Sequence, residues 1–285
     1  MESAEQIIER KREQLLGTKE NGSGGNTPQA AGSLPVTSET GKCPFGLCDG
    51  SGIIWVPEQN GGYPCRCVEL QNMEKKLSFA HIPKEFSHIR VNDFDIERYQ
   101  EAESRQVAYT AKKVAIRYIE GFAEMERLGK GLYFYSRERG SGKTMLMAGI
   151  GNALARVHGK RVRFATLIDL LEEIRRTFDA SSGETYSEML HEIREVDILL
   201  LDDIGAERPT EWAGEVFYNI LNRRMTAKKI TFFTSNLKME ELPYHGRLLA
   251  RIDKMAMPVK FPEESVRRQM SRQENEEMMK FLMAE

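Results

Sequence analysis

Apolar residues between positions 131 and 261 fall into short continuous runs, and the stretches between these runs carry apolar residues three or four positions apart. The first pattern is typical of buried strands and the second of amphipathic helices. The sequence predicts strands at 131–136, 160–165, 196–201, 230–234 and 257–261, and helices at 167–177, 186–193, 210–226 and 247–255. Strands that alternate with helices indicate a three-layer α/β domain with a parallel five-stranded sheet.

The same pattern predicts further elements around this core. A long helix from about 101 to 127 is expected before the first strand, and a Met-rich helix is expected at 263–285. A charged helix is expected at 68–77, and residues 81–94 are expected to form an extended connector with aromatic residues. Pro258 favours an edge position for the last strand, because proline has no N–H group to donate to a neighbouring strand.

The N-terminal region has a different composition. Residues 3–16 are expected to form a short helix, with Ile7, Ile8, Leu15 and Leu16 along one stripe. Residues 17–41 contain no aromatic residue and are rich in Gly, Ser, Thr and Pro, which is typical of a flexible linker. The helix is either a frayed terminus or a docking element for a partner. The expected divisions are an N-terminal helix (1–16), a linker (17–41), a cysteine-containing module (42–80), a core domain (81–262) and a C-terminal helix (263–285).

Composition narrows the class of protein. The 285 residues are 40% hydrophobic and 29% charged, which suits one core domain and a smaller piece. The net charge of −2 means that any contact with nucleic acid must be a local patch. No apolar run approaches the roughly 18–20 residues that span a bilayer, and the first 16 residues do not resemble a secretory signal. We therefore expect a cytoplasmic protein with no membrane partner and no structural disulfides.

All four cysteines lie between positions 43 and 67. Cys43 and Cys48 precede a predicted strand at 53–56, and Cys65 and Cys67 follow the Asn-Gly-Gly turn after it. Four thiolates at the ends of a small hairpin suit tetrahedral Zn²⁺. The spacing differs from two C-x2-C pairs, and buried apolar cysteines are the alternative. The clustering favours a zinc site.

The first predicted core strand leads into a glycine-rich loop. Gly140, Ser141, Gly142, Lys143 and Thr144 precede a stretch of good helix formers. Strand, glycine loop, Gly-Lys-Thr and helix are the context of a phosphate-binding loop, in which the lysine reaches the β- and γ-phosphates and the threonine hydroxyl binds Mg²⁺. Arg137 stands where the full pattern has its first glycine. A chance turn on a basic surface is the alternative, but the flanking strand and helix favour a nucleotide site.

Two other predicted strands end in polar residues. Asp202 and Asp203 follow one strand, and Asn236 follows another. In parallel α/β sheets ligands bind at the carboxyl ends of the strands, so these side chains and the glycine loop are expected to lie together. The combination predicts an NTPase that uses ATP and Mg²⁺. Asp202 would hold magnesium, Asp203 would orient and deprotonate the attacking water, and Asn236 would hold that water or the γ-phosphate.

Residues from about 80 to 270 resemble the AAA+ ATPases of the bacterial helicase-loader family, the DnaC/DnaI type, with the IstB transposition helpers as relatives. The motifs that carry the resemblance are Gly140–Thr144, Val196–Glu207, Thr234–Leu237 and Arg247–Ile252. The resemblance implies that Asp202 and Asp203 are the Walker B pair, that Asn236 is sensor one, that Arg251 is an arginine finger, and that Arg267 is a weaker candidate for a second sensor. Only 24 residues follow the last strand, so closure over ATP would depend on a neighbouring subunit.

The resemblance implies an ATP-dependent loader that places a hexameric replicative DNA helicase on single-stranded DNA. Residues 1–80 would bind the helicase, and the ATPase domain would self-associate and hold DNA. A cluster of basic residues and one aromatic residue is the expected DNA face: Lys160, Arg161, Arg163, Arg175, Arg176 and Phe178. The alternatives are a transposition helper ATPase, which needs no zinc module, and a non-enzymatic zinc adaptor with a vestigial nucleotide site.

Overall fold

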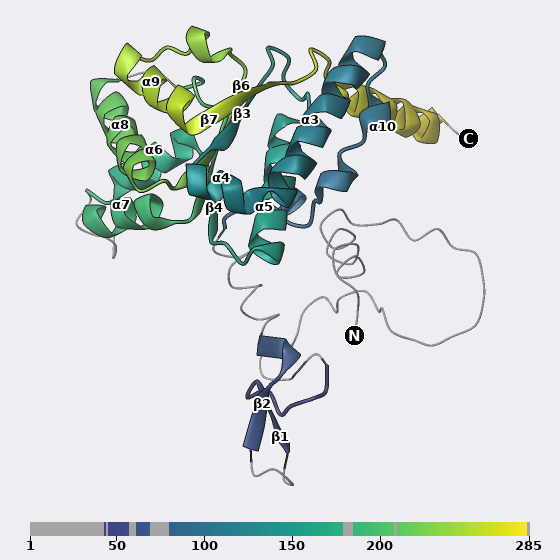
Figure 1. Ribbon diagram of the computed structural model, residues 1–285. Helices are drawn as coiled ribbons and strands as arrows, with labels where there is room; N and C mark the ends of the chain where they lie inside the picture. Colours follow the sequence, from purple (N-terminus) through teal and green to yellow (C-terminus); the bar gives the residue numbers. More distant parts are fainter. Residues whose placement is uncertain are drawn as a thin grey trace.

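The computed structural model describes residues 43, 45–56, 61–68, 80–178, 185–207 and 210–283. Its core is a five-stranded parallel sheet with strand order β4-β5-β6-β3-β7 (Figure 1). The strands are β3 (Gly131–Tyr135), β4 (Val162–Thr166), β5 (Ile198–Asp202), β6 (Ile230–Ser235) and β7 (Ala256–Lys260). The five predicted strands are confirmed to within two residues, and β7 lies at the edge that Pro258 favours.

Helices cover both faces of the sheet. Alternate residues of each strand point to opposite faces, so Leu200 joins one apolar cluster while Leu199 and Leu201 join the other. The first cluster holds α3 (Ala102–Glu120), α4 (Phe122–Leu128) and α5 (Lys143–Val157); the second holds α6 (Leu167–Arg176), α7 (Tyr186–Glu195), α8 (Glu211–Thr226) and α9 (Gly246–Met255). The three-layer architecture predicted from the sequence is confirmed.

The long helix expected at 101–127 is two helices. Gly121 ends α3 with φ −92° and ψ 20°, and Phe122 begins α4 with a buried ring. Glycine weakens a helix because it loses the most backbone freedom on folding. The turn places Phe122 against Tyr118, at a ring separation of 6.5 Å, inside the first cluster. Burial of this ring therefore outweighs the continuous helical pattern.

The connector expected to be extended consists of short 3-10 turns. These are η2 (Lys84–Phe86), η3 (Val91–Asp93) and η4 (Ile96–Arg98). The side chain of Asn152 on α5 donates to the carbonyls of Phe86 and Ile89, at 2.8 and 2.9 Å. Backbone groups near a buried surface need partners, and these local turns and side-chain donors provide them. The connector thus lies against α5, the helix that follows the glycine loop.

The cysteine-containing region forms an antiparallel hairpin of β1 (Ile53–Val56) and β2 (Gly61–Pro64). The predicted strand at 53–56 is confirmed. The helix expected at 3–16, the linker at 17–41 and, apart from Val68, the helix expected at 68–77 lie outside the described residues. At the other end of the chain, α10 (Val266–Met283) confirms the predicted C-terminal helix. Among the described helices, none combines the length and apolar character needed to cross a membrane.

Candidate functional site

The glycine loop connects β3 to α5 and requires glycine at two positions. Gly140 and Gly142 have φ of 76° and 90°, in the left-handed region that side chains disfavour. A Cβ atom on Gly142 would lie 2.7 Å from the Phe94 ring, and one on Gly140 would lie 2.7 Å from Cβ of Arg267. Arg137 has no positive φ, and its guanidinium pairs with Glu241 at 2.6 Å. Arginine therefore replaces the first loop glycine without backbone strain.

Lys143 lies inside this loop. Its side chain is buried, and its Nζ donates to the carbonyls of Ser136 and Glu138 at 3.2 and 3.0 Å. Burial lowers the pKa of Lys143 to about 8, although the carboxylates of Asp203 and Glu263 act in the opposite direction. A buried ammonium among carbonyl groups can bind a phosphate anion, and this ion pair would offset the free-energy cost of burying the charge.

The three predicted strand ends converge at this loop. The Thr144 hydroxyl donates to Asp202 Oδ1 at 2.8 Å, and the Thr234 hydroxyl donates to the same oxygen at 2.6 Å. Asn236 Nδ2 donates to Asp203 Oδ1 at 2.7 Å. Asp203 has φ 53°, a strained conformation for a residue other than glycine, and its N–H donates to the Thr234 hydroxyl. The loop threonine, both aspartates and the asparagine thus form one connected polar group.

Asp202 is suited to a cation. Burial raises its pKa, even though the Thr234 and Thr144 hydroxyls both stabilise the carboxylate, and the charge of Asp203 raises it further. A divalent cation beside two carboxylates and a threonine hydroxyl would reverse this effect. The oxygen ligands of Asp202 and Thr144 fit Mg²⁺, and Lys143 and the glycine loop fit the phosphates of a nucleotide.

Arg251 lies on α9 and is held by neighbouring side chains. Its Nε donates to Asn222 Oδ1 at 3.1 Å, one terminal nitrogen donates to the Arg247 carbonyl at 2.9 Å, and the other donates to the Tyr218 hydroxyl. The guanidinium carbon lies 4.1 Å from the centre of the Tyr218 ring. Three of the five guanidinium N–H groups have these partners, which leaves donors for an external anion. Arg251 is not part of the polar group around Asp202.

The C-terminal segment after β7 covers the glycine loop, and the sequence did not indicate how closely. Ser265 Oγ donates to the Arg139 carbonyl at 2.7 Å, and the Arg267 N–H donates to the Gly140 carbonyl at 3.3 Å. Ser136 Oγ donates to the Pro262 carbonyl at 2.7 Å. The Arg267 side chain is exposed. Arg267 therefore lies beside the loop, where a residue that senses bound nucleotide is expected.

Sequence reasoning missed two aromatic contacts to the loop. The Tyr99 hydroxyl donates to the Ser141 carbonyl at 2.7 Å, and the Phe94 ring packs against Gly142. Burial raises the pKa of Tyr99 above its usual range, so its hydroxyl stays protonated and remains a donor. The aromatic residues in and just after the connector were the available signal. The connector before α3 therefore supports the loop from outside the sheet.

The four cysteines lie together. Their sulfurs are all within 4.8 Å of one another, and none forms a disulfide. The Cys43 and Cys65 sulfurs are 3.6 Å apart, and those of Cys48 and Cys67 are 3.5 Å apart. Four sulfurs that each bind Zn²⁺ at about 2.3 Å in a tetrahedron are separated by about 3.8 Å. The cluster therefore has the donor set and spacing of a four-thiolate zinc site.

The thiols of this cluster also differ in how readily they ionise. Burial opposes ionisation of Cys43, but backbone N–H groups of the following turn, led by that of Cys48, lower its pKa to about 6. Burial and the neighbouring thiols raise the pKa of Cys67 far above its usual value. Four adjacent thiolates repel one another without a cation. Zinc would allow all four to ionise.

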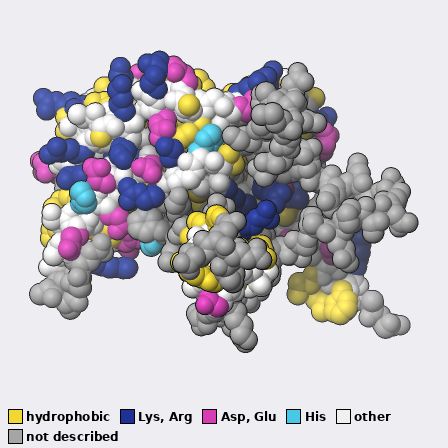
Figure 2. All heavy atoms as spheres, turned by 60° about the horizontal axis from the view of Figure 1, so that its bottom comes forward, with side chains coloured by type: hydrophobic (Ala, Val, Ile, Leu, Met, Phe, Trp, Pro, Cys, Tyr) yellow, Lys and Arg dark blue, Asp and Glu magenta, His cyan; other side chains and the backbone are white. Residues whose placement is uncertain are grey.

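The predicted DNA face is only partly available. The Arg163 side chain is 4% exposed and pairs with Glu173 at 2.6 Å, so its assignment to this face was wrong: a residue on β4 faces the α6 layer. Lys160 pairs with Glu126, and Arg161 pairs with Asp197. On the surface shown in Figure 2, Lys and Arg side chains are mixed with Asp and Glu and do not form one patch.

A group of three aromatic residues lies just after α6 and at the starts of α7 and α8. Phe178 is 57% exposed and stacks on Tyr186 at 5.1 Å, and its ring lies 6.3 Å from that of Trp212. The Arg175 guanidinium lies 5.0 Å from the centre of the Trp212 ring. This aromatic group with an attached arginine contains the exposed aromatic residue of the predicted DNA face.

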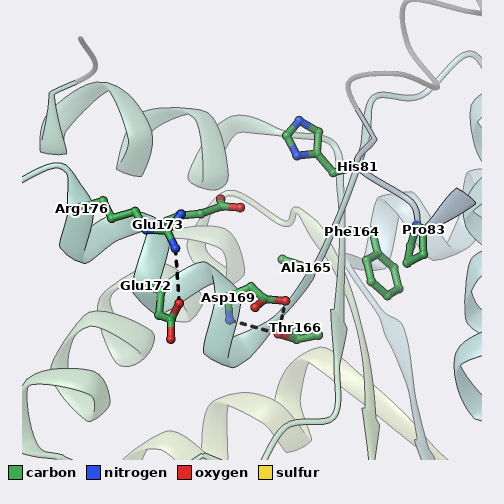
Figure 3. A pocket seen from close by; sticks show the side chains of 9 residues that line it. All are labelled: His81, Pro83, Phe164, Ala165, Thr166, Asp169, Glu172, Glu173 and Arg176. Atoms are coloured by element: carbon green, nitrogen blue, oxygen red, sulfur yellow. Dashed lines mark hydrogen bonds and ion pairs between the residues drawn. The ribbon is translucent and has the colours of Figure 1, made fainter. Parts of the chain in front are cut away.

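A cavity of about 330 Å³ lies elsewhere, between the connector and α6 (Figure 3). Its polar walls are His81, Thr166, Asp169, Glu172, Glu173 and Arg176. Asp169 accepts from the Thr166 hydroxyl at 2.7 Å, and Arg176 pairs with Glu172. None of the glycine-loop residues lines this cavity. The candidate nucleotide site is thus the loop and strand ends, not this cavity.

Comparison with known proteins places this geometry in a family. A family model described as IstB-like ATP binding protein matches residues 68–274, well over half of the chain. The chain belongs to the IstB-like ATP-binding family. The match includes the glycine loop, both strand-end motifs and Arg251, so the ATP-binding fold is shared by the region that carries the site.

Several relatives of this chain are named replicative helicase loaders. The replicative helicase loader DnaC of Buchnera aphidicola subsp. Acyrthosiphon pisum is 30% identical over 186 residues, which cover 65% of this chain and 72% of that protein. The replicative helicase loader DnaI of Bacillus subtilis is 33% identical over 154 residues, covering 49% of this chain and 48% of that protein. The match thus spans about half the length of the Bacillus relative.

Solved structures show the same fold. The crystal structure of DnaI is 29% identical with a TM-score of 0.50, and the match covers 63% of this chain and 94% of that one. The crystal structure of the DnaC helicase loader has a TM-score of 0.53 at 21% identity, covering 63% of this chain and 99% of that one. The sheet with helices on both faces is therefore the AAA+ fold of the helicase loaders.

Proposed function

We propose that this protein is an ATPase that loads a hexameric replicative DNA helicase onto single-stranded DNA. The observation that carries the proposal is the contact of Thr144 with Asp202, because it joins the phosphate loop to the Walker B strand. Membership of an ATP-binding family and the names of the helicase-loader relatives supply the partner and the process. The IstB-like family match also fits the transposition-helper rival, but the names of the helicase-loader relatives favour the loader, so neither rival is better supported.

Each polar residue of the site has a role in the proposed hydrolysis. Lys143 and the N–H groups of residues 140–144 would bind the phosphates, and Thr144 and Asp202 would hold Mg²⁺. Magnesium supplies charge neutralisation at the phosphates when it is bound. Asp203 would accept a proton from the attacking water, and Asn236 would orient that carboxylate through their 2.7 Å hydrogen bond. Arg267, beside the loop, would contact the nucleotide.

Arg251 would serve the nucleotide of a neighbouring subunit. Arg251 does not belong to the polar group around Asp202 of its own subunit. Tyr218 and Asn222 fix its guanidinium and leave some of its N–H donors available. A preorganised guanidinium stabilises charge that develops on a transferred phosphoryl group. The ATPase domain therefore has to self-associate for full activity.

The N-terminal region would provide helicase binding. The helix predicted at residues 3–16 would carry an apolar stripe and is followed by a polar sequence, and such a stripe would gain free energy only against another surface. The cysteine cluster would bind one structural Zn²⁺ and hold residues 43–67 folded. Bound zinc would favour the helicase loader over the transposition helper, because the transposition helper needs no zinc module.

Single-stranded DNA would bind at the aromatic group of Phe178, Tyr186 and Trp212. Phe178 and Tyr186 are exposed, and Trp212 is partly buried beside them. Exposed rings stack on bases of any sequence, and the adjacent Arg175 supplies positive charge for phosphates. The mixed charge of the surrounding surface confines this contact to a small area.

The direct test of enzymatic function is ATP hydrolysis with and without single-stranded DNA. We expect hydrolysis that DNA or the helicase stimulates and that Lys143→Ala abolishes. Hydrolysis at the same rate in the Lys143→Ala variant would contradict the assigned site. A wild-type protein that binds no ATP would support the non-enzymatic adaptor instead.

A further inference from the structure

Glu207 follows the Walker B aspartates and takes no part in the proposed hydrolysis, yet it forms a tight cluster with Tyr244. The Tyr244 hydroxyl donates a short hydrogen bond to Glu207 Oε1. The N–H of Gly205 donates to Glu207 Oε2 at 2.9 Å and to the Tyr244 oxygen at 3.0 Å. One backbone donor, one carboxylate and one phenol therefore close a ring of contacts just beyond Asp203.

The chain segments that meet at this cluster are packed closely. Gly205 has φ 85°, and a Cβ on it would lie 2.7 Å from the Leu242 side chain. The Ser235 hydroxyl donates to the Ile204 carbonyl at 2.7 Å and accepts from the Leu237 N–H at 3.1 Å. The loop after β5 and the segment 237–244 after β6 thus form one packed unit next to the nucleotide site.

Tyr244 also stands directly before α9. The helix begins after His245, whose carbonyl accepts from the Leu248 N–H at 2.9 Å, and the Tyr244 ring packs edge-on against Phe217 of α8 at 5.6 Å. Arg251, seven residues further on, contacts Asn222 and Tyr218 of the same helix α8. Tyr244 therefore fixes the start of the helix whose second turn carries Arg251.

We propose that Tyr244 and Glu207 are positioning residues that attach α9 to the loop after Asp203 and so place Arg251 for use by the neighbouring subunit. This inference rests on the proposed ATPase function and on Arg251 acting between subunits. Through this attachment, the loop that holds the catalytic carboxylate also sets the position of the arginine that the same subunit offers its neighbour.

The chemistry of the pair supports a fixed contact. Burial raises the pKa of Tyr244, and the charge of Glu207 raises it further, so the hydroxyl stays protonated and donates at physiological pH. A phenol-to-carboxylate hydrogen bond is stronger than one between neutral groups. Misplacement of a catalytic group by about 1 Å lowers rates by about 100-fold, so loss of a single anchoring hydroxyl is measurable in turnover.

The test uses full-length chains that complement each other. A Lys143→Ala chain has no working site but can supply Arg251, and an Arg251→Ala chain has a site but no arginine to supply. Mixing the two should restore ATP hydrolysis at the interfaces that combine both intact halves. Tyr244→Phe is then added either to the Lys143→Ala chain or to the Arg251→Ala chain. Tyr109→Phe, at an exposed position on α3, is the matched control.

We expect Tyr244→Phe to lower the restored rate by about tenfold or more when it is on the chain that supplies Arg251, and to leave the rate unchanged on the chain that supplies the site. Glu207→Ala should behave in the same way, and the double variant should be no worse than either single one. Melting temperatures and ATP affinity of the variants should match those of the Tyr109→Phe control.

The opposite results overturn the inference. An equal loss with Tyr244→Phe on either chain, or a loss only on the chain that supplies the site, would show that the pair acts on its own nucleotide site. An unchanged rate with the substitution on the supplying chain would show that it positions nothing. If the Lys143→Ala and Arg251→Ala chains restore no activity without any change at Tyr244, the shared site itself is refuted, and this inference falls with it.

Discussion

The hydroxyl of Thr144 and the carboxylate of Asp202 are joined by a 2.8 Å hydrogen bond across 58 residues of sequence. Because Thr144 lies in the first turn of α5 and Asp202 ends β5, this contact fixes the phosphate loop against β5. The same carboxylate oxygen accepts from Thr234 on β6. One oxygen therefore links the three strand-end motifs on which the proposed ATP site depends.

Lys143 and Asp203 should affect different steps. Lys143→Ala should weaken ATP binding by about tenfold to 100-fold, because a charge-assisted contact with phosphate is lost, and should abolish hydrolysis. Asp203→Asn should leave ATP binding largely intact and stop turnover, because an amide cannot accept the proton of the attacking water. Equilibrium binding of a fluorescent ATP analogue and single-turnover hydrolysis separate the two effects. Weak binding by Asp203→Asn would contradict the role given to this carboxylate.

ATP affinity should depend on pH through Lys143. The pKa of this buried lysine is about 8 in the nucleotide-free protein, and phosphate binds its charged form. Nucleotide binding therefore raises the pKa and takes up a proton, so affinity is nearly full below pH 7 and falls by about tenfold as pH rises from 7 to 9. Lys143→Arg keeps its charge throughout this range and serves as the control. A wild-type affinity that stays constant to pH 9 would contradict this prediction.

The protein should contain one zinc ion per chain, held by Cys43, Cys48, Cys65 and Cys67. Metal analysis of protein purified without chelators should give a ratio near one, and replacement of Cys65 by serine should abolish it because a closed four-thiolate site requires every ligand. Protease digestion should then cleave within residues 43–67 in the variant and spare them in the wild type. Protein that contains no zinc before any chelator is added would refute the site.

Arg224 should contribute strongly to stability. Its guanidinium is fully buried and donates to the carbonyls of Ile193, Val196 and Ile230, at 2.9, 2.8 and 2.6 Å. Arg224→Met should lower the free energy of unfolding by about 3 kcal/mol, because these carbonyls lose their donors. The neighbouring Arg223 is exposed, so Arg223→Met should change stability by less than about 0.5 kcal/mol in the same urea titration. Equal losses in the two variants would contradict the account.

Single-stranded DNA binding should depend on the aromatic group more than on the surrounding charges. Phe178→Ala should weaken binding of an oligonucleotide by about tenfold, since stacking on one base contributes about 1–3 kcal/mol. Lys160→Ala should have little effect, because Lys160 pairs with Glu126 at 2.5 Å. Fluorescence anisotropy at increasing salt should show falling affinity for the wild type. Binding that is unaffected by Phe178→Ala, or constant as salt rises, would place the DNA contact elsewhere.

The sequence predicts the sheet and the convergence of its strand-end side chains well because both have strong local signals. The run before Asp202 is apolar on both faces, as a central strand requires, and Gly140 and Gly142 take the backbone conformations that only glycine adopts easily. The carboxyl ends of parallel strands share one edge of the sheet. The side chains that follow three separate strands were therefore brought together by topology alone.

Contacts between segments distant in the chain gave no such signal. In the sequence, Arg163 is one of several basic residues close together. In the structure, its position on β4 points its side chain towards Glu173 of α6. The break at Gly121 depends on how the Phe122 ring packs, which no helical pattern shows. The Tyr244–Glu207 contact joins two loops 37 residues apart, and Tyr244 lies outside every motif that the sequence offered.

The most direct test of the central claim is ATP-dependent transfer of the replicative helicase of the same cell onto single-stranded DNA circles. We expect the full-length protein with ATP to leave helicase on the DNA after free protein is removed. Lys143→Ala, or a chain that lacks residues 1–80, should leave little or none. Transfer at the wild-type level by both variants, or no association of the helicase with the full-length protein, would contradict it.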